Sequence, residues 1–140
     1  MGLLDTLQIT ASGLTAQRLR LQTVASNMAN ARTTRTEEGG PYKKQMPLLE
    51  AVRDEPFGSE MDRAMARVEV MGVVESEDPP VMVHDPGHPD ADADGYVAYP
   101  NVNVLEEMVD LMTTARTYEA NANVLEMTDM MANTALEIGR

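Results

Sequence analysis

Apolar residues recur at helical spacing across residues 101–138, a stretch that contains neither proline nor glycine. Steps of three and four residues place such positions on one side of a helix. Pro100 precedes the stretch, and Asn103 with Glu106 has the spacing of a capping box. Gly139 follows it. The pattern predicts one long helix of about 52 Å, which exceeds the diameter of a compact globule, so we expect an elongated molecule.

A second helical pattern covers residues 3–31. Its apolar positions are spaced three and four residues apart, close to the heptad spacing of a coiled coil, and Arg18 is the one polar residue in this row. The row consists of Leu4, Leu7, Ala11, Leu14, Leu21, Ala25 and Met28. Neither helix can bury its apolar side alone, so we expect the two to pair as a coiled-coil-like layer. Gly13 lowers helix propensity and suggests a bend or a close helix approach there.

The composition changes after residue 31. Short runs rich in β-formers predict strands at residues 42–52, 66–74, 81–83 and 96–99, with a turn-rich linker at 36–41 and a polar loop at 53–62. Strands this short form only a thin core. The predicted fold class is mainly α with a small module of short antiparallel strands. The domains are then a terminal helical one, residues 1–31 and 101–140, and a β-rich one, residues 32–100.

The charge balance excludes one class of partner. The chain has 11 basic and 23 acidic residues and a net charge of −12, which argues against nucleic-acid binding. It has no cysteine, so it can form no disulfide and offers no thiol nucleophile. No apolar run reaches the roughly 18 residues of a membrane span. The first residues lack a basic segment and a continuous apolar segment, so we expect no cleaved signal peptide.

Two polar turns contain aspartates and histidines, which are residue types that can bind a metal. Residues 90–95 match the first half of an EF-hand loop, but Asn101 stands where a bidentate Glu is required. His84 and His88 are separated by a proline and a glycine, which prevent a helical ligand pair. The pattern favours solvated structural turns over a metal site. With no catalytic triad, phosphate loop or dinucleotide motif, we expect no enzyme activity, cofactor or metal.

Asn27 and Asn30 lie three residues apart near the end of the first helix, beside small residues. Two interpretations remain open. In the first, which spacing alone favours, the asparagines cap a fraying helix end. In the second, their amides form a hydrogen-bonded network that joins neighbouring helices, including those of neighbouring subunits.

Three motifs resemble the flagellar rod and hook axial protein family. Val24-Ala25-Ser26-Asn27-Met28-Ala29-Asn30-Ala31, with Thr33-Thr34 and Tyr42-Lys43-Lys44, is similar to the N-terminal signature of that family. Tyr118-Glu119-Ala120-Asn121-Ala122-Asn123-Val124-Leu125 is similar to its C-terminal signature. The short length and the loop at residues 84–97 are most similar to a proximal rod member. The linker at residues 35–41 is longer than in hook-type relatives.

The resemblance implies a structural subunit of the proximal rod of the bacterial flagellar basal body. Such a subunit self-assembles through its terminal helices into a helical drive shaft with other rod proteins. It implies export by the flagellar type III apparatus into the periplasmic space. The alternative is a cytosolic coiled-coil adaptor or export chaperone. The predicted assembly interface consists of Leu7, Leu14, Leu21, Asn27, Met28, Asn30, Met108, Leu111, Tyr118, Asn121, Leu125 and Met131.

Overall fold

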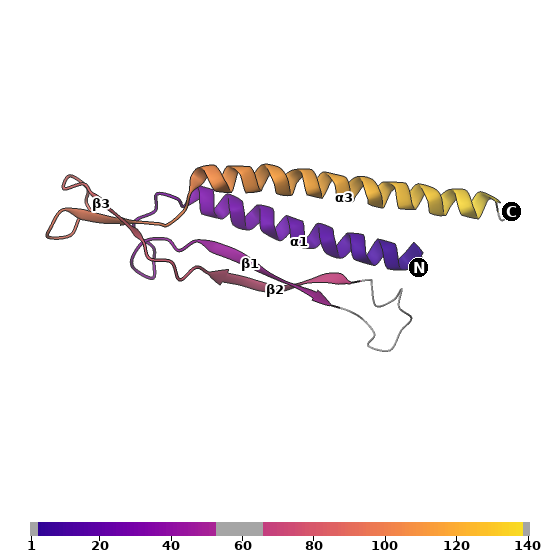
Figure 1. Ribbon diagram of the computed structural model, residues 1–140, viewed down its shortest axis with the longest axis horizontal. Helices are drawn as coiled ribbons and strands as arrows, with labels where there is room; N and C mark the ends of the chain where they lie inside the picture. Colours follow the sequence, from indigo (N-terminus) through magenta and orange to yellow (C-terminus); the bar gives the residue numbers. More distant parts are fainter. Residues whose placement is uncertain (1–2, 53–65, 139–140) are drawn as a thin grey trace. The chain divides into compact units, whose positions relative to one another are not determined.

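The computed structural model describes residues 3–52 and 66–138, so the predicted loop at 53–62 lies outside the described residues. Along the chain, four short strands lie between two long helices (Figure 1). The elements are α1 (Leu3–Ala29), β1 (Gln45–Val52), β2 (Arg67–Glu75), β3 (Val81–His84), β4 (Tyr96–Tyr99) and α3 (Val104–Ile138). The predicted fold class, mainly α with a small antiparallel β module, is confirmed.

Local hydrogen bonds set the ends of both helices. At the start of α3, Asn103 Oδ1 accepts a bond of 3.1 Å from Leu105 N, which is the N-cap interaction expected for asparagine. At the end of α1, Asn30 Nδ2 donates to Ser26 O at 3.0 Å, and Thr33 Oγ1 donates to Asn30 Oδ1 at 3.2 Å. Asn30 therefore terminates the helix, as the capping interpretation predicts for this residue.

The strands form two separate sheets of two strands, β1 with β2 and β3 with β4. The second sheet is antiparallel, with Val81 opposite Tyr99 and His84 opposite Tyr96. Val97 is fully buried, whereas Val81, Met82 and Val83 are exposed. Each sheet therefore has little core of its own, as expected for strands this short.

The described residues divide into two compact units, and each unit takes in part of both helices. Of the described residues, the first unit contains 3–21, 47–52, 66–72 and 113–138, and the second contains 22–46 and 73–112. In the first unit, a Cβ added at Gly13 would lie 3.3 Å from Asn121 Nδ2. Gly13 therefore permits a close approach of α3, which is one of the two roles that the sequence suggests for it.

The most buried positions of the two helices are small or polar. In α3 they are Glu107, Thr114 and Thr128, seven and then fourteen residues apart, with exposed fractions of 4%, 2% and 8%. In α1 they are Thr10, Ala16, Thr23, Val24 and Asn27. Leu7, Leu14 and Leu21 of α1 are only half-buried. Small side chains let two helix backbones approach closely, so the larger apolar residues are left beside the contact or away from it.

Among the described residues, no helix has the length and hydropathy that crossing a membrane requires.

Candidate assembly interface

The amide of Asn27 is the centre of a hydrogen-bonded cluster in the second unit. Its Oδ1 accepts bonds from Gln45 N at 2.8 Å and from Tyr42 Oη at 2.9 Å. Its Nδ2 donates to Gln45 O at 2.9 Å and to Glu107 Oε2 at 3.2 Å. An asparagine amide has two donor hydrogens and two acceptor lone pairs, so all four are used. Asn27 is 1% exposed.

The cluster joins three segments that are far apart in the sequence. Lys44 Nζ lies 2.7 Å from Glu107 Oε1, and the Glu107 side chain is only 5% exposed. Lys44 and Asn27 together satisfy both oxygens of this carboxylate. A buried charge is tolerated when it is paired and hydrogen-bonded in this way. We call Asn27, Tyr42, Lys44, Gln45 and Glu107 the Asn27 hub.

The Asn27 hub bears directly on the two interpretations of the asparagines. An amide network between helices is present, because Asn27 in α1 bonds to Glu107 in α3. All four positions of the Asn27 amide are filled from within this chain, so none is left for a neighbouring subunit. Sequence reasoning did not identify Gln45 and Glu107 as its partners. The N-terminal signature did contain Tyr42 and Lys44, but only the fold brings them to Asn27.

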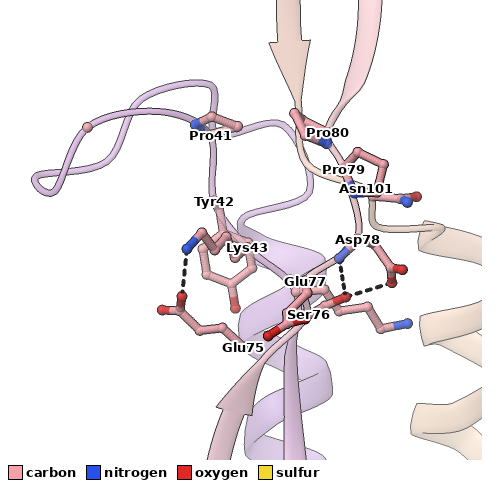
Figure 2. Close-up of a pocket in the computed structure, with 12 residues that line it drawn as sticks. Pro41, Tyr42, Lys43, Glu75, Ser76, Glu77, Asp78, Pro79, Pro80 and Asn101 are labelled. Atoms are coloured by element: carbon pink, nitrogen blue, oxygen red, sulfur yellow. Dashed lines mark hydrogen bonds and ion pairs between the residues drawn. The ribbon is translucent and has the colours of Figure 1, made fainter.

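An open cleft of about 580 Å³ lies beside the hub in the same unit. Figure 2 shows Lys43 paired with Glu75 at its edge, where Lys43 Nζ lies 3.3 Å from Glu75 Oε2. Ser76 Oγ donates to Asp78 Oδ2 at 2.6 Å. Three prolines, Pro41, Pro79 and Pro80, also line the cleft. The Lys43–Glu75 ion pair and the Ser76–Asp78 bond both lie within the cleft lining, so the cleft is built as a structural junction between strand ends.

The acidic loop at residues 90–95 is held by turns. Asp92 Oδ1 accepts from Asp94 N at 2.9 Å and from Tyr96 N at 2.8 Å. Asp90 Oδ2 accepts from Thr34 Oγ1 at 2.8 Å. The two bonds to Asp92 are the side-chain-to-backbone bonds that aspartate makes in turns, whereas the bond to Asp90 ties the loop to the segment after α1. Within residues 3–52 and 66–138, no cluster of three or more His, Asp or Glu side chains is placed to hold a metal ion.

The two histidines next to this loop pack on tyrosines. The His84 ring meets Tyr96 edge-on with 5.1 Å between ring centroids, and His88 meets Tyr99 at 6.1 Å. His88 Nδ1 also accepts from Asp90 N at 3.1 Å. Both histidine rings therefore pack on tyrosines of β4, while His84 stays exposed to solvent as the sequence suggested.

We predict that Gly95→Val destabilises the turn before β4 by roughly 2 kcal/mol. Gly95 has φ of +79°, a conformation that β-branched residues disfavour. A Cβ there would also lie 3.1 Å from Pro86 Cγ and 3.2 Å from His84 Nε2. Urea unfolding followed by tyrosine fluorescence measures the effect. Gly87→Ala is the control, because its Cβ meets only Asp85 at 3.6 Å, and equal losses in both variants would contradict the prediction.

Large apolar side chains of α3 are exposed in two clusters along the helix. We call the surface that these clusters form the outer face of α3. It contains a cluster in the second unit, Leu105, Met108, Val109 and Met112, and a cluster in the first unit, Val124, Met127, Met130 and Met131. Their exposed fractions run from 45% to 70%. Exposed Arg116, Glu119 and Asn123 separate the clusters along the helix. Soluble monomers rarely expose such groups without a binding role.

The predicted interface residues fall into three groups. Asn27 is buried in the hub, and Met108, Tyr118 and Met131 are exposed on α3. The remaining residues are half-buried: Leu7, Leu14, Leu21, Met28, Asn30, Leu111, Asn121 and Leu125. The interface predicted from the sequence does not include the other residues of the two exposed clusters of α3, which are Leu105, Val109, Met112, Val124, Met127 and Met130.

Two family profiles match the helical ends of the chain. Residues 7–35 match the flagella basal body rod protein family. Residues 93–138 match the C-terminal region of the flagellar basal body rod FlgEFG proteins. The first match contains Asn27 and most of α1, and the second contains all of α3.

Several relatives that share one name match this chain over nearly their whole length. The flagellar basal-body rod protein FlgC of Bacillus subtilis is 41% identical over 145 residues, which cover 96% of each chain. FlgC of Borreliella burgdorferi is 37% identical over 149 residues, covering 99% of this chain and 98% of that protein. FlgC of Salmonella typhimurium is 39% identical over the full length of both. A fold of two long helices with small sheets and this near-complete similarity establish that the chain belongs to the FlgC family of flagellar basal-body rod proteins.

Proposed function

We propose that this structural rod subunit self-assembles, with other rod proteins, through its terminal helical segments, residues 1–31 and 101–140. The single observation that carries the proposal is the exposed outer face of α3. Its clusters are too apolar to remain in water at no cost, since each buried large side chain is worth about 1.5–3 kcal/mol. Contacts between different surfaces of identical subunits extend into helical assemblies, which is the geometry that a rod requires.

The proposed interface has two parts. On α3 it uses the outer face together with Tyr118, which is 37% exposed. On α1 it uses the half-buried row of Leu7, Leu14, Leu21 and Met28, which keeps part of its apolar surface open. Leu111, Asn121 and Leu125 border the contact between the helices and complete the surface. The β-rich segment, residues 32–100, then contributes its two sheets and three members of the hub to the shape of the subunit, without catalytic chemistry.

We further propose that the subunit occupies the proximal rod in the periplasmic space. It would arrive there through the flagellar type III export apparatus, without a cleaved signal peptide. A chain whose helices gain most of their burial on assembly suits export in an unfolded form, because ordering costs are then met at the assembly site. The alternative, a cytosolic coiled-coil adaptor or export chaperone, is not favoured, because the relatives described above are named rod proteins.

Fractionation of cells distinguishes these two roles. An epitope placed in the 53–65 segment would be followed in a strain whose own copy of the gene is deleted. We expect the tagged chain to restore motility and to copurify with isolated basal bodies on immunoblots. A chain that restores motility but is found only in the cytosol would instead support the adaptor role. Untagged chain in the same strain is the control for interference by the epitope.

A further inference from the structure

We propose that the five methionines of α3 form a site of reversible oxidation to methionine sulfoxide, and that this modification blocks assembly of the subunit. The inference rests on the proposed function, because it treats the outer face of α3 as part of the assembly interface. The oxidant is a peroxide that meets the subunit before its incorporation into the rod. Assembly then covers the same side chains and protects them from further reaction.

The methionines of α3 are all exposed, and each belongs to one of the two clusters of the outer face. In the second unit, Met108 and Met112 are 45% and 55% exposed and lie about one helical turn apart. In the first unit, Met127, Met130 and Met131 are 60%, 56% and 68% exposed. The helix therefore places its thioether sulfurs on the surface that the proposed assembly buries.

Methionine is the side chain of this protein that a peroxide oxidises most readily, because the chain has neither cysteine nor tryptophan. A lone pair of Sδ attacks one oxygen of hydrogen peroxide, and the O–O bond breaks. That oxygen stays on the sulfur, and the other leaves as hydroxide, which takes up the released proton to form water. The sulfur loses two electrons and the peroxide gains two.

The oxidised side chain is tolerated in the free subunit and unfavourable in the assembly. A sulfoxide converts an apolar side chain into a polar one that accepts hydrogen bonds, and on an exposed surface water satisfies it. The other members of the clusters, Leu105, Val109 and Val124, have no hydrogen-bond donor on their side chains. Burial of the clusters against a neighbour would leave the new oxygens unpaired, which is costly. Sulfoxide reductases restore the thioether, so the block is reversible.

Peroxide treatment followed by peptide mapping in a mass spectrometer tests the accessibility of these sulfurs. In the purified full-length chain, we expect the α3 methionines to oxidise within about threefold of the rates of Met71 and Met82, exposed strand methionines of similar exposed fraction. In isolated basal bodies, the α3 rates should fall at least about tenfold. Slow oxidation of α3 in the free chain, or equal α3 rates in both samples, would overturn the inference.

Glutamine substitution tests the effect on assembly without an oxidant, because glutamine is polar, uncharged and similar in length to methionine sulfoxide. Met127→Gln, Met130→Gln and Met131→Gln combined should lower the number of basal bodies per cell at least about fivefold in a strain whose own copy is deleted. Leucine at the same three positions should leave it normal, since leucine stays apolar and close in volume. Met71→Gln combined with Met82→Gln is the control and should also assemble.

Normal basal-body numbers with the triple glutamine variant, or equal losses in the strand control, would contradict the inference. Equal urea midpoints for the purified variants show that folding is unchanged, and Met131→Gln alone, with a smaller loss, gives the same test should the triple variant unfold. Met131→Glu in the same strain separates the two proposals. If it also assembles normally, the proposed interface fails. If it blocks assembly while the glutamine variants assemble, the interface stands and the oxidation site alone is rejected.

Discussion

Replacing Asn27 with alanine is expected to destabilise the subunit by roughly 3 kcal/mol, because the change leaves buried groups without partners. Gln45 would lose both of its bonds to the amide, and Glu107 would lose one of its two partners. Asn27→Asp should cost more still. It retains the acceptor oxygen but removes the donor that now faces Glu107 Oε2, and it places a second carboxylate beside the first.

Asn30→Ala is the matched control for Asn27→Ala. It makes the same chemical change three positions away on the same helix. Asn30 makes two local bonds, to Ser26 and from Thr33, and it is only half-buried. We therefore expect a loss below about 1 kcal/mol. Urea denaturation followed by tyrosine fluorescence measures both, since Tyr42 lies in the hub. Losses of similar size in the two variants would show that the hub has no special role in stability.

Met131→Glu is expected to abolish rod assembly while changing the stability of the free subunit by less than about 0.5 kcal/mol. Met131 is 68% exposed, so a charge there remains solvated in the monomer. In a helical assembly the same charge would be buried at every repeat of the contact, and an unpaired buried charge is strongly unfavourable. Electron microscopy of isolated basal bodies and immunoblots of the same preparation measure assembly.

Two further variants separate an apolar contact from a general effect of charge. Met131→Leu preserves the apolar surface and should still assemble. Asn133→Glu adds the same charge at an exposed position off the apolar cluster and should assemble as well. Detection of each variant in the periplasm shows that export was completed. Normal basal bodies with Met131→Glu would remove the outer face of α3 from the proposed interface.

Much of the secondary structure could be read from the sequence because it depends on local rules. The long uninterrupted pattern before Gly139 predicts α3, and the cap at Asn103 forms as expected. The short runs of β-formers predict the four described strands to within a few residues at each end. Positive φ at Gly95 also fits its position in the turn. Each of these features is decided by neighbouring residues along the chain.

The role of each helix side was decided by the tertiary structure. Apolar periodicity in the sequence favours the leucine row of α1 as a pairing surface. In α3 it favours the side of the helix that carries Met108 and Tyr118. The structure instead buries Ala16, Thr23 and Asn27 of α1 and Glu107, Thr114 and Thr128 of α3. Periodicity shows which residues share a side, but it cannot show which side meets which partner. A subunit built to assemble has more apolar surface than its own fold can cover.

The sequence by itself determined the helices, the strands, the turn residues and the membership of a rod family. The tertiary structure alone decided how Asn27 is used. Its amide meets the backbone of Gln45 and the carboxylate of Glu107, which is eighty positions away in the chain. No local pattern encodes a contact of that range, because it arises only when two helices and a strand converge. The hub and the outer face of α3 are therefore properties of the fold.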